Sequence, residues 1–303
     1  MRFFTDETFL LLGGCGMVGQ QIAHEIARDL DPRLIILCGL TDEEVERAVA
    51  SLRRDFPQVS VTGAVGDVFV RSEWNPHGRG AGGRLDRREL LASEEHRAAL
   101  YEDVFLDREG AYGRSELVRL IRAYAPNVVI DSINTATAFS YQDVYTASDL
   151  ARRTLDELKA AQRGETAGEN LAGLIGAAGE ALDAVLISQS VPQLVRHVLF
   201  INDAMREAKT RLYLKVGTTG TGGMGLNIPY THSEDSPSAT LMEKTAIAFA
   251  HTGLMYLMAR TLGGPAVKEF KPAAGRFELV APAPETFAVP SATPMACSVL
   301  PIS

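Results

Sequence analysis

The chain has 303 residues, of which 46% are hydrophobic and 22% are charged, and its formal net charge is −8. This length allows one large domain or two small ones, and the composition is that of a globular protein. No long basic run indicates a nucleic-acid partner, no apolar run reaches the roughly 20 residues of a membrane span, and three scattered cysteines form neither a disulfide framework nor a zinc site. We therefore expect a cytoplasmic protein with no nucleic-acid partner, no membrane partner and no metal.

The first predicted element is an apolar strand that runs into a glycine-rich turn, Phe9-Leu-Leu-Leu-Gly-Gly-Cys-Gly-Met-Val-Gly19. A helical pattern follows over residues 20–30, and a second apolar strand over residues 33–38. In such a turn, backbone N–H groups contact a pyrophosphate at the positive end of a helix, where a larger side chain would block the ligand. The context predicts dinucleotide binding by Gly13, Gly14, Gly16, Met17, Val18 and Gly19.

Two alternatives stay open for this turn. The glycines fit G-x-G-x-x-G when the motif begins at Gly14, and they fit G-x-x-G-x-x-G when it begins at Gly13. The turn could also serve only to pack a helix against a sheet, although we favour dinucleotide binding.

The second strand ends without the acidic residue that usually contacts the ribose of NAD. Asp42, Glu43 and Glu44 follow it, and we favour their use as the first turn of a helix over residues 42–54, with Thr41 as its cap. No arginine stands there for a 2′-phosphate. We expect NADP or NAD as the cofactor, with NADP slightly preferred.

The middle of the chain returns to strands after an irregular insertion. A third strand over residues 59–68 ends in Gly66-Asp67-Val68, and residues 69–113 are predicted to be an insertion, part loop and part helix. A helix over 115–124 and a fourth strand from 128 follow. Ligands of an open α/β sheet lie beyond the carboxyl ends of its strands, so the strand exit should face the cofactor with Ser132, Ile133, Asn134 and Thr135.

The second half of the chain repeats the alternation. We expect a helical region over 141–163, a polar link over 164–170, a glycine- and alanine-rich stretch to 179, a helix over 191–208 and a strand over 210–216. A second glycine-rich loop, 217–225, precedes a helix over 238–261 and a sixth strand over 266–271. The sequence therefore predicts a doubly wound parallel sheet, a Rossmann fold, in a domain of residues 1–275, followed by an irregular, proline-interrupted tail of residues 276–303.

The order of these features resembles the short-chain dehydrogenase/reductase superfamily, most closely its extended branch, over residues 9–275. Gly13-x-x-Gly16-x-x-Gly19 looks like its phosphate loop, and residues 66–68, 132–136, 216–219 and 268–272 look like its later strand ends. The resemblance implies that Asp67 and Val68 lie near the adenine, and that Ile133, Asn134 and Thr135 lie near the nicotinamide ribose. It also implies that Thr218 or Thr219 contacts the substrate carbonyl.

The chain departs from this family at the acid/base. The family carries Tyr-x-x-x-Lys on the helix after the fifth strand, with tyrosine as acid/base and lysine on the ribose. Here Lys244 stands at the lysine position, whereas Thr240 replaces the tyrosine. Three alternatives stay open: Tyr230 supplies the phenol, another donor or a bound water supplies the proton, or the site binds cofactor without hydride chemistry.

The function that we expect is an NAD(P)-dependent oxidoreductase, a dehydrogenase/reductase or an epimerase-like enzyme, acting on a small carbonyl or alcohol. The alternative is a non-catalytic NAD(P)-binding sensor or scaffold protein. A homodimer through the helix over 238–261 is also possible, since its apolar surface is wide enough for a core face and a partner: Ala246, Phe249, Ala250, Leu254, Leu257 and Met258.

Overall fold

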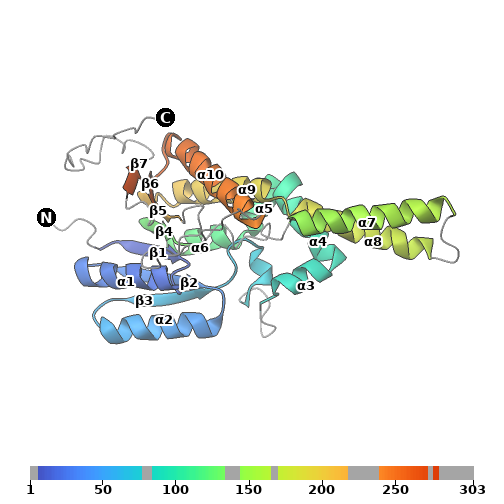
Figure 1. Cartoon of the computed structure of the whole chain (residues 1–303). Helices are drawn as coiled ribbons and strands as arrows, with labels where there is room; N and C mark the ends of the chain where they lie inside the picture. Colours follow the sequence, from blue (N-terminus) through green and yellow to red (C-terminus); the bar gives the residue numbers. More distant parts are fainter. Residues whose placement is uncertain are drawn as a thin grey trace.

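The computed structural model describes residues 6–76, 84–133, 144–164, 170–217, 239–271 and 276–279. Its centre is one seven-stranded sheet (Figure 1). In spatial order the strands are β3 (Val61–Val65), β2 (Leu34–Gly39), β1 (Thr8–Leu12), β4 (Val128–Asp131), β5 (Leu212–Val216), β6 (Ala266–Lys271) and β7 (Arg276–Leu279). The six strands β1 to β6 pair in parallel, in the 3-2-1-4-5-6 order of the Rossmann fold, so the predicted fold class is confirmed.

Alternate side chains of the central strand enter two hydrophobic cores. Phe9 and Leu11 pack with α1 (Met17–Asp29) and α2 (Asp42–Asp55). Leu10 and Leu12 face the opposite side, where the core includes α6 (Glu116–Tyr124), α9 (Ser190–Glu207) and α10 (Ala239–Ala259). Strands covered on both faces are continuously apolar, which is why their sequence pattern predicted them well.

The insertion after β3 is more helical than the sequence pattern suggested. It contains η1 (Ser72–Trp74), α3 (Arg87–Ala92), α4 (Glu94–Tyr101), the short π-helix η4 (Glu102–Leu106) and α5 (Arg108–Arg114). Each α-helix begins at a side chain that accepts a hydrogen bond from its first turn: Asp86, Ser93 and Asp107. A small core of its own, around Trp74 and Leu90, holds the segment together.

A helical hairpin was not predicted. α7 (Val144–Gln162) and α8 (Leu171–Ile187) pack side by side and project from the body of the molecule (Figure 1). The glycine- and alanine-rich stretch to residue 179, to which the sequence analysis assigned no structure, is the first half of α8. Among the described residues no single helix is long and apolar enough to cross a membrane, while α8 and α9 pass that test only as a pair bent by 50°.

The sheet continues beyond the predicted domain boundary at residue 275. β7 pairs antiparallel with β6, with Lys271 opposite Arg276 and Lys268 opposite Leu279. Residues 280–303 lie outside the described part of the chain. The remaining domain limits stay predictions.

Candidate active site

The glycine turn after β1 has the geometry of a phosphate loop. Gly13 has φ = +74°, a conformation that favours glycine, and a Cβ on Gly19 would lie 2.3 Å from the Gly13 carbonyl oxygen. Gly16 is the N-cap of α1, and the atom nearest to a Cβ placed there is the same oxygen at 3.4 Å. The G-x-x-G-x-x-G register fits this geometry, because the turn is tight at Gly13, the approach is open at Gly16 and the packing is close at Gly19.

A cavity of about 210 Å³ opens beside this turn, at the carboxyl ends of β1 to β4. This is the place where an open α/β sheet binds its ligands. The predicted residues Gly13, Gly16, Asp67, Val68 and Ile133 line it. The other lining residues are Cys38, Gly39, Leu40, Glu44, Gly66, Phe69, Arg87 and Ser132.

Four predicted residues of the same loop do not line the cavity. Gly14 and Gly19 are buried against the sheet and the turn, where a Cβ would meet the backbone. Met17 and Val18, in the first turn of α1, are 80% and 39% exposed. Their backbone places α1 with its N-terminus at the cavity, while their side chains point elsewhere.

Asp67 is fully engaged at the end of β3. Its Oδ1 accepts a hydrogen bond from the Phe69 amide at 3.0 Å, and its Oδ2 accepts from Nε and Nη2 of Arg87 at 3.1 and 3.0 Å. Its own amide donates to Oδ1 of Asn75 at 2.7 Å. The insertion therefore supplies one wall of the cavity through Arg87, which the sequence analysis did not foresee.

Glu44 lines the cavity from the first turn of α2. Thr41 caps this helix, as predicted, by accepting the Glu44 amide at 3.3 Å. The charge of Glu44 also acts on the buried Cys15. Burial raises the pKa of Cys15 to about 12, and the Glu44 charge adds to this shift, so the thiol stays protonated.

The predicted catalytic residues fall largely outside the described part of the chain. Thr218, Thr219 and Tyr230 lie there, as do Asn134 and Thr135 of the predicted cofactor contacts. Lys244 belongs to the helix α10, but its side chain is outside the described part. Their roles stay predictions.

A buried polar cluster at the ends of β4 and β5 was missed. Nζ of Lys215 lies 3.0 Å from Oδ2 of Asp131 and donates to the Ile133 carbonyl at 2.7 Å. The Tyr213 hydroxyl donates to the same Asp131 oxygen at 2.9 Å. All three side chains are at most 3% exposed. Polar residues inside two apolar strands were the available sequence signal, because a strand covered on both faces has no solvated side for them.

Two histidines complete this cluster. His197 of α9 and His251 of α10 are buried and line a water-sized cavity of about 10 Å³ together with Asp131 and Lys215. Burial alone would raise the pKa of Asp131, but that pKa lies below its usual value, and the charge of Lys215 is the largest cause that lowers it. Burial lowers the pKa of His197 to about 4, so this imidazole is neutral at pH 7.

The cluster adjoins the cavity beside the glycine turn. Phe69 and Ile133 line both the larger cavity and the water-sized one. The Ile133 carbonyl is also the acceptor of Lys215. A proton-bearing ammonium and a carboxylate therefore lie one residue away from the cavity wall. Within the described residues, no group of three or more potential metal-ligating side chains is assembled.

Comparisons with known proteins give a fold-level likeness. No family model and no curated protein matches the chain. Pen from Bacillus thuringiensis is 10% identical with a TM-score of 0.36, over 89% of this chain and 50% of that one. L-Sorbose reductase from Gluconobacter frateurii, complexed with NADPH and L-sorbose, is 12% identical with a TM-score of 0.37, over 84% and 64%. A double mutant of a short-chain dehydrogenase/reductase from Serratia marcescens is 13% identical with a TM-score of 0.42, over 88% and 73%.

The matched part of this chain thus spans half the length of the Bacillus protein. The Serratia protein belongs to the family that the sequence motifs resemble. Because these identities are low and the TM-scores are below 0.5, the Rossmann assignment rests on the strand order and not on these likenesses.

Proposed function

We propose that this protein is an NAD(P)-dependent oxidoreductase of short-chain dehydrogenase type, acting on a small carbonyl or alcohol. The observation that carries the proposal is the glycine turn, whose open Gly16 position faces a cavity of about 210 Å³ at the carboxyl ends of β1 to β4. The N-terminus of α1 supplies backbone N–H groups and partial positive charge for a pyrophosphate. A pyrophosphate fits this turn because glycines stand where the Cβ of another residue would fill the space.

Residues of the chain would bind the substrate and transfer the proton. A bound nicotinamide would supply or accept the hydride. One proton must then move at the substrate oxygen, and we propose Tyr230 as its donor, with Thr218 or Thr219 on the carbonyl and Lys244 on the ribose. Asn134 and Thr135 would extend the contacts of Ile133. The buried Lys215–Asp131 pair is a second proton-bearing candidate, since Nζ of Lys215 keeps a third N–H beyond its contacts to Asp131 and Ile133.

A titration of NADH and NADPH against the purified protein tests the proposal. We expect saturable binding of at least one of them, followed by fluorescence, and its loss in Gly16→Asp. The new carboxylate would occupy the phosphate path, while the fold accepts a Cβ whose nearest atom is 3.4 Å away. Gly179→Asp is the matched control, because a Cβ there meets nothing within 4 Å and the site is remote on α8. No binding of either dinucleotide by the native chain would refute the proposal.

The non-catalytic alternative, a sensor or scaffold that binds the dinucleotide, rests on Thr240 at the position of the family's tyrosine. It predicts the same titration but no cofactor oxidation with any aldehyde or ketone. Cytoplasmic location and the absence of nucleic-acid and membrane partners stay predictions.

A further inference from the structure

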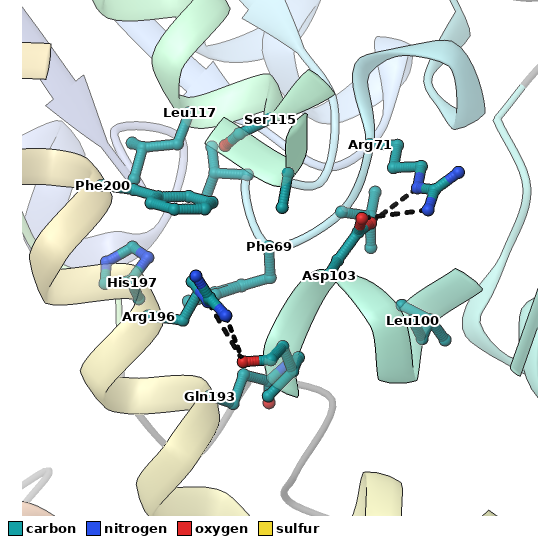
Figure 2. A pocket seen from close by; sticks show the side chains of 14 residues that line it. Phe69, Arg71, Leu100, Asp103, Ser115, Leu117, Gln193, Arg196, His197 and Phe200 are labelled. Atoms are coloured by element: carbon teal, nitrogen blue, oxygen red, sulfur yellow. Dashed lines mark hydrogen bonds and ion pairs between the residues drawn. The ribbon is translucent and has the colours of Figure 1, made fainter. Parts of the chain in front are cut away.

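A third cavity lies beyond the dinucleotide site, between the insertion and α9 (Figure 2). Its volume is about 50 Å³. It shares Val68 and Phe69 with the dinucleotide cavity, and it shares Phe69, Gln193 and His197 with the water-sized cavity of the Lys215 cluster. Phe69 thus stands where the three spaces meet, so a molecule in the third cavity would lie next to both the cofactor site and the acid–base cluster.

The two arginines on the wall of this cavity, Arg71 and Arg196, differ in how their charges are balanced. Arg71 is neutralised, because its Nε lies 2.6 Å from Oδ2 of Asp103 and its Nη2 lies 2.9 Å from Oδ1. Arg196 instead donates both Nε and Nη2 to one neutral acceptor, the Val104 carbonyl, at 3.1 and 2.7 Å. Among the described residues, no carboxylate lies within ion-pair distance of Arg196. Its guanidinium also lies over the Phe200 ring, with Cζ 5.6 Å from the ring centroid.

Arg196 is therefore a half-buried cation with no anionic partner within the described part of the chain. Burial, and then the charge of Arg108, lowers the pKa of Arg196, and the more distant Asp103 and Asp107 offset this only in part. His197 beside it is neutral at pH 7 and adds no second positive charge. A buried arginine is stabilised most by a carboxylate held through charge-assisted hydrogen bonds.

We infer that this cavity binds the carboxylate of a small oxo or hydroxy acid, and that Arg196 is the residue that recognises it. The inference rests on the proposed function, because it takes that acid as the substrate, bound beside the Lys215 cluster. Figure 2 shows Arg196 and His197 on α9, facing Arg71 and Asp103 from the other side of the cavity. The apolar walls, Leu100, Val104, Leu117 and Phe200, leave room only for a short carbon chain.

Calorimetric titration with a panel of short acids, pyruvate, 2-oxobutyrate and 4-oxopentanoate, tests the inference, each compared with its uncharged methyl ester. The titrations are made with and without saturating oxidised cofactor, which has no hydride to give to an oxo acid, so that acid binding is read without turnover. We expect at least one acid to bind and its ester to bind more than tenfold more weakly. Arg196→Gln removes a charge-assisted hydrogen bond. It should lower the affinity for the acid roughly tenfold to a hundredfold and leave the affinity for the cofactor unchanged.

Arg108→Gln is the matched control, because it removes the same charge from a neighbouring exposed arginine that pairs with Asp203 and does not line the cavity. It should change acid affinity less than about threefold, because an exposed charge is screened by solvent. Cofactor binding without binding of any acid, equal affinity for acids and esters, or equal loss in both arginine variants would overturn the inference. Absence of cofactor binding would instead refute the proposed function, so the two failures are distinguishable.

Discussion

At the scale of single residues, Lys215 and Asp131 form an ion pair inside the sheet. Removal of one partner leaves a buried charge uncompensated, which typically costs about 3–5 kcal/mol. We expect Lys215→Met to lower the free energy of unfolding by this amount. The double variant Lys215→Met with Asp131→Asn should lose less, because no unpaired charge remains. Urea unfolding measures both, and a double variant less stable than the single one would contradict the ion-pair account.

His197 makes stability depend on pH. Its pKa is about 4 in the folded chain and near 6.5 when unfolded, so between these values the unfolded chain binds the extra proton. Its contribution to stability is complete above about pH 6.5 and is lost as the pH falls toward 4, by at most about 3 kcal/mol. We expect His197→Asn to flatten the unfolding free energy across this window. Curves for variant and native chain that run parallel would show that His197 does not titrate in this way.

Glu44 should bias the choice between the two dinucleotides. The cavity wall carries its carboxylate, whereas the charge of the lining Arg87 is already matched by Asp67. A 2′-phosphate near Glu44 would meet a like charge. Glu44→Gln should therefore increase the affinity for NADPH relative to that for NADH about fivefold to tenfold. Glu43→Gln is the control, since Glu43 is exposed and pairs with Arg47 outside the cavity. An unchanged ratio in Glu44→Gln would place the 2′ position elsewhere.

At the scale of elements, the glycines of α1 and α8 should respond in opposite directions when they are replaced by alanine. A Cβ at Gly176 or Gly179 meets nothing within 4 Å, whereas a Cβ at Gly19 would lie 2.3 Å from a backbone oxygen. Because glycine in a helix interior costs about 0.5–1 kcal/mol relative to alanine, Gly176→Ala and Gly179→Ala should each stabilise α8 by that amount. Gly19→Ala should destabilise the protein. Hydrogen exchange of the hairpin and urea unfolding check the two directions.

The elements that the sequence predicted share one property. β1, β2 and α2 are each predicted by a local sequence signal, which is an apolar run or a cap such as Thr41. The structure confirms all three elements. α8 was missed because its glycines lower helix propensity and its packing against α7 is a tertiary contact. The insertion was underestimated although Asp86 and Ser93 gave cap signals.

The candidate site was predictable to the same degree. Gly13 and Gly16 follow from a local motif at the carboxyl end of a strand, whereas Asp67 was implied only by the resemblance to the short-chain dehydrogenase/reductase superfamily. Arg87 and Arg196 could not be predicted, because the insertion and α9 reach the site only through the tertiary fold. Lys215 and Asp131 were visible as polar residues in apolar strands, yet only the pairing of β4 with β5 shows that they meet.

At the scale of the whole molecule, the sheet organises three adjoining spaces. β1 to β4 end at the proposed dinucleotide cavity, β4 and β5 carry the Lys215 cluster, and α9 lines the cavity of Arg196. Phe69 follows β3 and lines all three. Strand order therefore brings together the three spaces to which we assign the cofactor, the buried ion pair and the carboxylate, with the insertion as their outer wall.

The surface of α10 bears on assembly. One face, with Ile247, Met255 and Met258, is buried in the core, as expected for a helix that covers the sheet. A second apolar stripe is exposed: Ala246, Phe249, Gly253, Tyr256 and Leu257. Phe249 is 74% and Leu257 63% exposed, so the apolar surface of this helix exceeds what the described residues of one chain cover.

We therefore predict a homodimer through this stripe. Sedimentation at micromolar concentration should give twice the chain mass of 32.7 kDa. A buried charge opposed to its own copy in a two-fold contact costs several kcal/mol, so Phe249→Glu should yield a monomer with native circular dichroism. Leu182→Glu, which changes an equally apolar and 55% exposed residue of α8, should remain dimeric. A monomeric native chain, or a dimer that only Leu182→Glu disrupts, would show that the second face of α10 is not the contact between copies.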